Sequence, residues 1–210
     1  MYLSYRKDRA ILLLLSLLPF FLFASPVAAE GYQITPFLGY RIGGDFEDAN
    51  SNSVFELTEE STYGIIFDKT LKSGQQIEFF YSKQPSRLVT GDTFTTNIVF
   101  DVDVEYFHVG SRTFLNQENG TFVVGTIGAT RFSPDSPGVG SETNLSLGLG
   151  GGFETGGDKG FGFRLEGRGF GTFLDSSGAI FCGSAGGCTI ISSNSFLWQL
   201  ELIAGLSYKF

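Results

Sequence analysis

The chain has 210 residues, with 14 Lys and Arg against 22 Asp and Glu, which gives a formal net charge of −8 at pH 7. A chain this acidic repels a phosphate backbone, so nucleic acid is excluded as a partner. Its 29 Gly, 23 Phe and 8 Tyr beside a single Met are unusual for a soluble domain, whereas glycines and aromatics that alternate along strands are typical of membrane barrels.

The N-terminal segment has the three parts of a secretory signal peptide. Basic residues precede an apolar run at residues 10–23, and small residues follow it up to Ala29. The alternative is a membrane anchor, but a spanning helix needs about 20 apolar residues, and this shorter run contains a proline. We therefore expect residues 1–29 to be removed between Ala29 and Glu30 after export by the Sec pathway, leaving one domain at residues 30–210.

Beyond residue 30, apolar residues recur at every second position, which is the period of a β-strand whose two faces meet different surroundings. Eight such runs follow in chain order, at residues 32–43, 55–68, 76–82, 98–106, 121–131, 144–153, 161–173 and 196–210. The fourth run alternates most cleanly, with Val102, Val104 and Tyr106 opposed to its acidic residues. The fifth run is blurred by glycines, so its register stays open.

Eight runs are an even number, and each is long enough to cross a membrane as a tilted strand. Lipid cannot satisfy the backbone groups of a free strand edge, so the runs must close into a ring. Short connections at residues 69–75, 115–120 and 155–160 alternate with longer ones at 44–53, 83–96, 133–142 and 175–194. The sequence therefore predicts an all-β fold, an eight-stranded antiparallel up-and-down transmembrane β-barrel with its short turns in the periplasm.

The last strand places Leu202, Leu206, Tyr208 and Phe210 on one face. This ending, together with the eight runs, resembles the small outer-membrane barrels of the OmpX and OmpA membrane-domain type. The resemblance implies a Gram-negative outer membrane, contact with its lipid and lipopolysaccharide, and recognition of these four residues by the barrel-assembly machinery. A soluble periplasmic barrel is the alternative, but eight strands enclose too little space for so many large aromatics, which favours apolar faces that point toward lipid.

If the apolar faces of the strands point outward, their charged faces point into the lumen, where charges must be paired. The predicted lumen charge network consists of Glu78, Asp101, Asp103, Glu105, Arg164, Glu166, Arg168 and Glu201. We expect Arg164 and Arg168 to bridge Glu166 and the acidic residues of the fourth run, so that the network fills the barrel. The alternative is a narrow, cation-selective conductance past an acidic lining, because a wide pore does not fit inside eight strands.

The sequence predicts no catalytic, metal or cofactor site. The single histidine, His108, lies three residues before Ser111, so on a strand the two side chains point to opposite faces. This spacing departs from the histidine–serine arrangement of outer-membrane enzymes that modify lipid. We place His108 on the lipid-facing side near the membrane interface. One histidine and two cysteines make no metal-ligand cluster, and the acidic ladder lacks the spacing of a calcium loop.

Cys182 and Cys188 lie close together in the longest predicted outer loop, and an exported pair of this kind is expected to form a disulfide. Exposed apolar residues beside the pair can form a contact site. We predict a non-enzymatic integral outer-membrane protein whose loops have a structural or surface-interaction role, toward an external ligand or host surface that no motif identifies. The alternatives are a narrow channel or transporter for small ions or hydrophobic molecules and, more remotely, a lipid-modifying enzyme.

Overall fold

The computed structural model describes residues 31–47, 54–71, 75–92, 95–116, 119–157, 159–174, 179–182, 188–191 and 196–210. The predicted signal peptide and its cleavage site lie outside these residues. The described part contains the strands β1 (Tyr32–Gly43), β2 (Asp45–Glu47), β3 (Val54–Leu57), β4 (Glu60–Thr70), β5 (Gln76–Asp92), β6 (Thr95–Asn116), β7 (Thr121–Pro134), β8 (Glu142–Glu154), β9 (Gly160–Phe173), β10 (Ala179–Cys182), β11 (Cys188–Ile191) and β12 (Phe196–Lys209). Within it, no helix is long and apolar enough to span a membrane.

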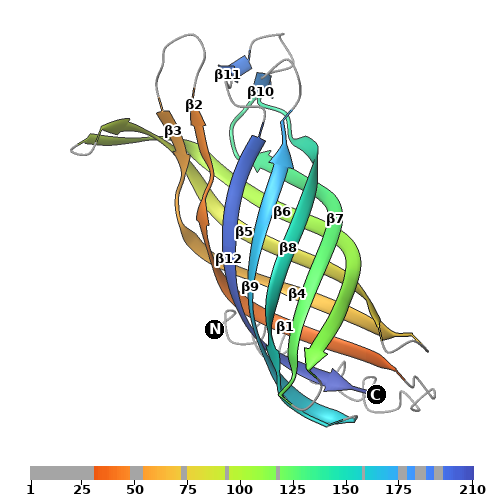
Figure 1. Cartoon of the computed structure of the whole chain (residues 1–210). Helices are drawn as coiled ribbons and strands as arrows, with labels where there is room; N and C mark the ends of the chain where they lie inside the picture. The colour runs from red at the N-terminus through yellow and green to blue at the C-terminus, as the bar shows by residue number, and fades with distance from the viewer. Residues whose placement is uncertain are drawn as a thin grey trace, which may run out of the picture. The chain divides into compact units, whose positions relative to one another are not determined.

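Eight of these strands form a closed ring of antiparallel neighbours, in the order β1, β4, β5, β6, β7, β8, β9 and β12. The ring closes because β12 pairs with β1, where Arg41 lies opposite Glu201. Figure 1 shows the tilted strands wrapping around a common axis. The predicted eight-stranded antiparallel up-and-down barrel is therefore confirmed. Closure leaves no strand edge for lipid to meet within the ring.

The lipid-facing belt consists of outward apolar side chains on successive strands. Those more than 60% accessible are Leu38, Leu115, Leu149, Phe161, Trp198, Leu202 and Leu206. Their neighbours two residues away on the same strands are also outward, while the intervening residues are buried or face the lumen. This is the alternation expected of strands with hydrocarbon outside and a packed interior.

The strands β5 and β6 are longer than the sequence predicted, with 17 and 22 residues. The prediction of a loop at residues 83–96 is wrong, because the ladder between these strands continues from Lys83 opposite Glu105 to Asp92 opposite Thr95. Figure 1 shows the resulting hairpin, in olive, projecting from the end of the barrel away from the C-terminus. The short β3 pairs with the upper part of β5, and β2 pairs with β3.

The end of the barrel that carries this hairpin is called the outer end below, and its interior is apolar. Its buried side chains, each 3% exposed or less, include Leu57, Leu88, Val104, Phe132 and Leu197. They come from β3, β5, β6, β7 and β12, near the ends of the strands that lie farthest from the chain's C-terminus. The outer section therefore packs like the core of a soluble barrel, with its apolar side chains inside.

The fourth predicted run, now β6, has its faces reversed. Its apolar side chains point inward and are 2% exposed or less: Val102, Val104 and Tyr106. The predicted lumen acids lie on the outward side instead: Asp101, Asp103 and Glu105. There Asp103 pairs with Lys83 of β5 at 2.6 Å. Because this part of the strand lies above the apolar belt, its outward face meets water and its inward face joins the apolar core.

Candidate functional site in the barrel lumen

The inner half of the lumen holds a network of ion pairs centred on two arginines of β9. Arg164 Nη2 lies 2.7 Å from Glu78 Oε2 and 2.6 Å from Glu166 Oε2. Arg168 Nη2 lies 2.7 Å from Glu78 Oε1 and also pairs with Glu166. Alternation along β9 turns all three of its charged residues inward. The two arginines therefore share two carboxylates, one from their own strand and one from β5.

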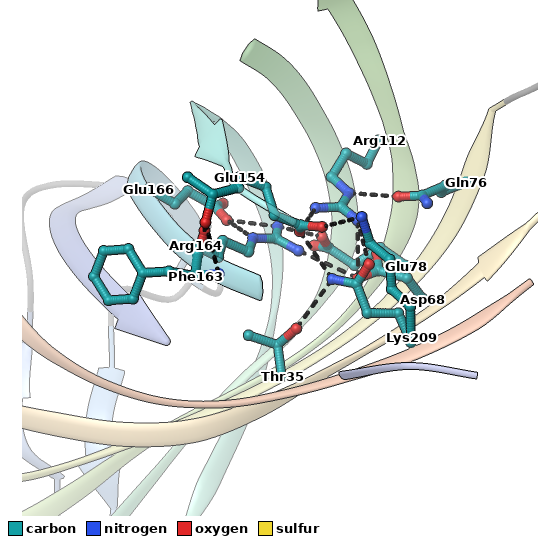
Figure 2. A network of polar contacts seen from close by, with 12 residues as sticks. Thr35, Asp68, Gln76, Glu78, Arg112, Glu154, Phe163, Arg164, Glu166 and Lys209 are labelled. Carbon is teal, nitrogen blue, oxygen red and sulfur yellow. Dashed lines mark hydrogen bonds and ion pairs between the residues drawn. The ribbon is translucent and has the colours of Figure 1, made fainter. Parts of the chain in front are cut away.

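The network continues toward the inner end through Arg112 of β6, as Figure 2 shows. Arg112 Nη1 lies 2.6 Å from Glu154 Oε2, and Arg112 Nη2 lies 3.3 Å from Asp68 Oδ2. Asp68 also faces Arg164 at 3.3 Å. Lys209 Nζ lies 2.8 Å from Glu154 Oε1. Six strands of the ring thus contribute charges to one contiguous cluster.

The charges of this inner network balance. Four carboxylates face four cations, namely Asp68, Glu78, Glu154 and Glu166 against Arg112, Arg164, Arg168 and Lys209. Every side chain except that of Lys209 is at most 1% exposed. Since isolated buried ions are very costly, pairing is what allows these groups to lie in the lumen. The result is a neutral plug, which differs from the excess of acid that the sequence predicted.

A separate pair lies further toward the outer end. Arg41 Nη2 of β1 lies 2.9 Å from Glu201 Oε2 of β12, and both side chains are fully buried. The other carboxylate oxygen accepts hydrogen bonds from Thr62 at 2.5 Å and from Ser82 at 2.8 Å. The guanidinium also stacks on Tyr106, 4.5 Å from the ring centre. This pair has the full set of donors that a buried carboxylate needs.

His108 lies inside the barrel, and the prediction that it faces lipid is wrong because the faces of β6 are reversed. Its Nδ1 lies 2.9 Å from Thr126 Oγ1, and its Nε2 lies 2.8 Å from Ser146 Oγ. Its ring meets Phe170 edge-on at 5.3 Å. Gly148 makes room for this contact, because a Cβ there would collide with Thr126 Oγ1. The serine–histidine contact has the geometry of a nucleophile and base, but the serine is completely buried.

Of the predicted network, the structure brings five members into the lumen: Glu78, Arg164, Glu166, Arg168 and Glu201. The expected partners Asp101, Asp103 and Glu105 are outside, so the arginines pair with Asp68 and Glu78 instead. Sequence reasoning missed Arg112 and Glu154. Each continues the inward alternation of its strand, Arg112 four residues after His108 and Glu154 two after Gly152. Following each run to its last charged residue would have found both.

The remaining predicted residues lie at the two ends of the barrel. Leu202, Leu206, Tyr208 and Phe210 all point outward along one face of the C-terminal strand. Cys182 and Cys188 lie directly opposite each other in the hairpin of β10 and β11. Opposed residues in an antiparallel ladder have Cα atoms about 4.5–5.5 Å apart, which lies within the range for a disulfide. The disulfide itself stays a prediction.

No protein-family model matches the chain, and no curated protein sequence matches it. Solved structures are similar. Neisserial surface protein A matches with a TM-score of 0.55 and 11% identity over 86% of this chain and 97% of that chain. The outer membrane protein OprG from Pseudomonas aeruginosa matches with a TM-score of 0.48 and 11% identity, over 85% and 95%. At 11% identity, the likeness to Neisserial surface protein A shows the fold alone.

Proposed function

We propose that this chain, which has the fold of the small eight-stranded outer-membrane barrels, is a non-enzymatic integral protein of a Gram-negative outer membrane that acts through its outer end. The observation that carries the proposal is the filled lumen. The inner half holds the charge-balanced network, and the outer half holds an apolar core. An interior of this kind stabilises the barrel and leaves the outer end as the part available for interactions.

The outer end extends beyond the apolar belt. Along β5, the outward positions change from Ile77 and Phe79 to Lys83 and Arg87. This change marks where the outward face leaves hydrocarbon and enters water. Beyond it, apolar side chains are exposed on the hairpin and on the neighbouring β3, with Ile98 60% and Val54 46% accessible. Exposed apolar residues on a rigid ribbon are typical of contact surfaces.

The same proposal includes the partners that the sequence predicts. Lipid and lipopolysaccharide would surround the apolar belt, and the barrel-assembly machinery would recognise the C-terminal face of Leu202, Leu206, Tyr208 and Phe210. Export through the Sec pathway and a stiffening disulfide between Cys182 and Cys188 complete the proposal. The disulfide fits an outer-membrane protein, since the periplasm is oxidising.

Surface location is tested by cysteine labelling of intact cells. In a Cys182→Ser, Cys188→Ser background, Ile98→Cys should react with a membrane-impermeant maleimide. Thr155→Cys, at the opposite end of the barrel, should react only after the outer membrane is permeabilised. Labelling of Thr155→Cys alone on intact cells would reverse the orientation and overturn the proposal.

Conductance measurements distinguish a transport function from the proposed surface-interaction role. The refolded protein should be silent in a planar bilayer, because the lumen is filled. Steady single-channel conductance that Glu78→Gln changes would support a channel instead. Asp103→Asn is the matched control, since it removes one carboxylate from the outside of the barrel and should leave any lumen conductance unaltered.

A second candidate, passage of small hydrophobic molecules, is favoured by one observation. A hollow of about 440 Å³ opens on the lipid-facing surface, lined by residues that include Ile65, Phe79, Phe107, Val109 and Ile127. Such a surface could receive an apolar solute laterally. Protein-containing vesicles that take up a fluorescent alkane-chain probe faster than empty ones, with the rate reduced by Val109→Trp, would support this function over surface contact.

A further inference from the structure

The hollow on the lipid-facing surface lies next to the row where the outward face of the barrel changes from apolar to charged. The charged row consists of Lys83 on β5, Glu105 on β6 and Arg131 on β7, which lie opposite one another in the ladders. The next two rows toward the inner end line the hollow, first with Tyr81 and Phe107, then with Phe79, Val109 and Ile127. At about 3.3 Å per residue along a strand, the hollow begins about 7 Å from the charged row.

The hollow has the chemistry of a site for hydrocarbon. Its lining comes from β1, β4, β5, β6 and β7 and is aliphatic and aromatic on the outward side. The side chains of Phe79 and Ile127 are 52% and 51% exposed, so they leave a recess of about 440 Å³ between strands of the belt. An unfilled recess of this kind forfeits dispersion contacts. Of the components of a membrane, a flexible acyl chain is the one that can enter it and restore them.

The three outward cations that the structure describes at the outer end differ in their partners. Lys83 Nζ lies 2.6 Å from Asp103 Oδ2. Arg87 Nη2 lies 3.2 Å from Glu60 Oε1. Arg131 is exposed and, among the described residues, has no ion-pair partner. It is therefore the cation of this group whose charge is available to a ligand.

Arg131 is placed to bind an anion above the hollow. It lies four residues beyond Ile127 on the outward face of β7. Glu105, which is opposite Arg131 in the ladder, accepts a hydrogen bond from the Tyr81 hydroxyl at 2.8 Å. That bond directs the carboxylate toward β5, away from Arg131. A guanidinium free of carboxylates binds phosphate through two parallel N–H donors.

We propose that Arg131 and the hollow together form a binding site for one molecule of lipid A, the phosphorylated and acylated sugar of lipopolysaccharide. Arg131 holds a phosphate of the sugar, and the hollow takes an acyl chain of the same molecule. The step of about 7 Å between them leaves room for the sugar that joins phosphate to chain. This inference rests on the proposed function, because it requires Arg131 to lie in the outer leaflet. A lipid bound here would also occupy the surface through which a hydrophobic solute would enter.

The test is native mass spectrometry of the protein purified from outer membranes, delipidated in detergent and titrated with lipid A. We expect one lipid A to bind at least about tenfold more tightly than the same lipid after dephosphorylation, because the arginine loses its acceptor. Phosphatidylglycerol should also bind more weakly, since a phosphate monoester carries nearly two charges and a diester carries one. Equal binding of dephosphorylated lipid A would overturn the role of Arg131. Equal binding of phosphatidylglycerol would overturn the assignment to lipid A.

Variants locate the phosphate contact. Arg131→Gln should weaken lipid A binding by about tenfold and abolish the preference for the phosphorylated form. Arg87→Gln is the matched control, because it removes an outward arginine of β5 that already pairs with Glu60. If both variants weaken binding equally, the effect is one of overall charge and the proposal fails.

A second pair of variants locates the acyl chain. Ile127→Trp fills the hollow without changing any charge, so it should weaken phosphorylated and dephosphorylated lipid A by the same factor. Leu147→Trp is the control, because Leu147 lies opposite Ile127 on β8 and faces lipid outside the hollow. Equal effects of the two tryptophans would refute the acyl site. Labelling of Ile98→Cys on intact cells is independent of these measurements, so a labelled protein that fails to bind lipid A would refute this site and leave the surface location intact.

Discussion

Removal of one member of the Arg41–Glu201 pair should destabilise the barrel strongly. Both side chains are fully buried, so Arg41→Met leaves the Glu201 carboxylate charged in the lumen with only the Thr62 and Ser82 hydroxyls as donors. Breaking a buried pair in this way costs about 3–5 kcal/mol. The ratio of folded to unfolded protein should therefore fall by about two to four orders of magnitude.

Removing both charges should cost less than removing one. In the Arg41→Met, Glu201→Leu double variant no ion is left unpaired. What remains is the loss of an acceptor for the Thr62 and Ser82 hydroxyls, worth about 1–3 kcal/mol. The double variant should therefore be more stable than either single variant, with a coupling free energy of several kcal/mol in a double-mutant cycle.

The assay is urea-dependent unfolding in lipid vesicles, followed by the fluorescence of the single tryptophan, Trp198, which lies on the outward face. Lys83→Met with Asp103→Leu is the control cycle, because that pair is partly exposed and should be worth less than about 1 kcal/mol. If Arg41→Met lowers the free energy of unfolding by less than about 1 kcal/mol, the lumen is hydrated and the argument from burial is wrong. The same conclusion follows if the costs of the two single variants simply add in the double variant.

Three further outcomes are expected. Intact-mass analysis after alkylation under non-reducing conditions should find Cys182 and Cys188 unmodified, and two added alkyl groups without reduction would contradict the disulfide. Brominated lipids should quench Trp198, which is 66% exposed on the apolar belt; unquenched emission would place that face away from hydrocarbon. His108→Leu should cost about 1–3 kcal/mol in the same urea assay, because two buried hydroxyls lose their partner, and an unchanged midpoint would indicate that water replaces the ring.

Much of the lumen could be predicted from the sequence because its charges repeat at two-residue steps. Arg164, Glu166 and Arg168 had to share a face, and a lipid-exposed alternative was excluded by their charge. Which carboxylates they meet could not be predicted, since that depends on which strands face each other across the ring. In the structure, Arg164 pairs with Asp68 of β4 and Glu78 of β5.

The sequence by itself determined the period of the strands, their even number and the apolar C-terminal face, because alternation and closure follow from local geometry and from what lipid excludes. Only the tertiary structure decided which face of β6 points inward. An alternating pattern does not by itself determine which of its two faces points inward. Whether Val104 or Asp103 points inward depends on whether water or hydrocarbon lies outside the strand at that position along the barrel axis. That position is set by how far β5 and β6 pair beyond the ring.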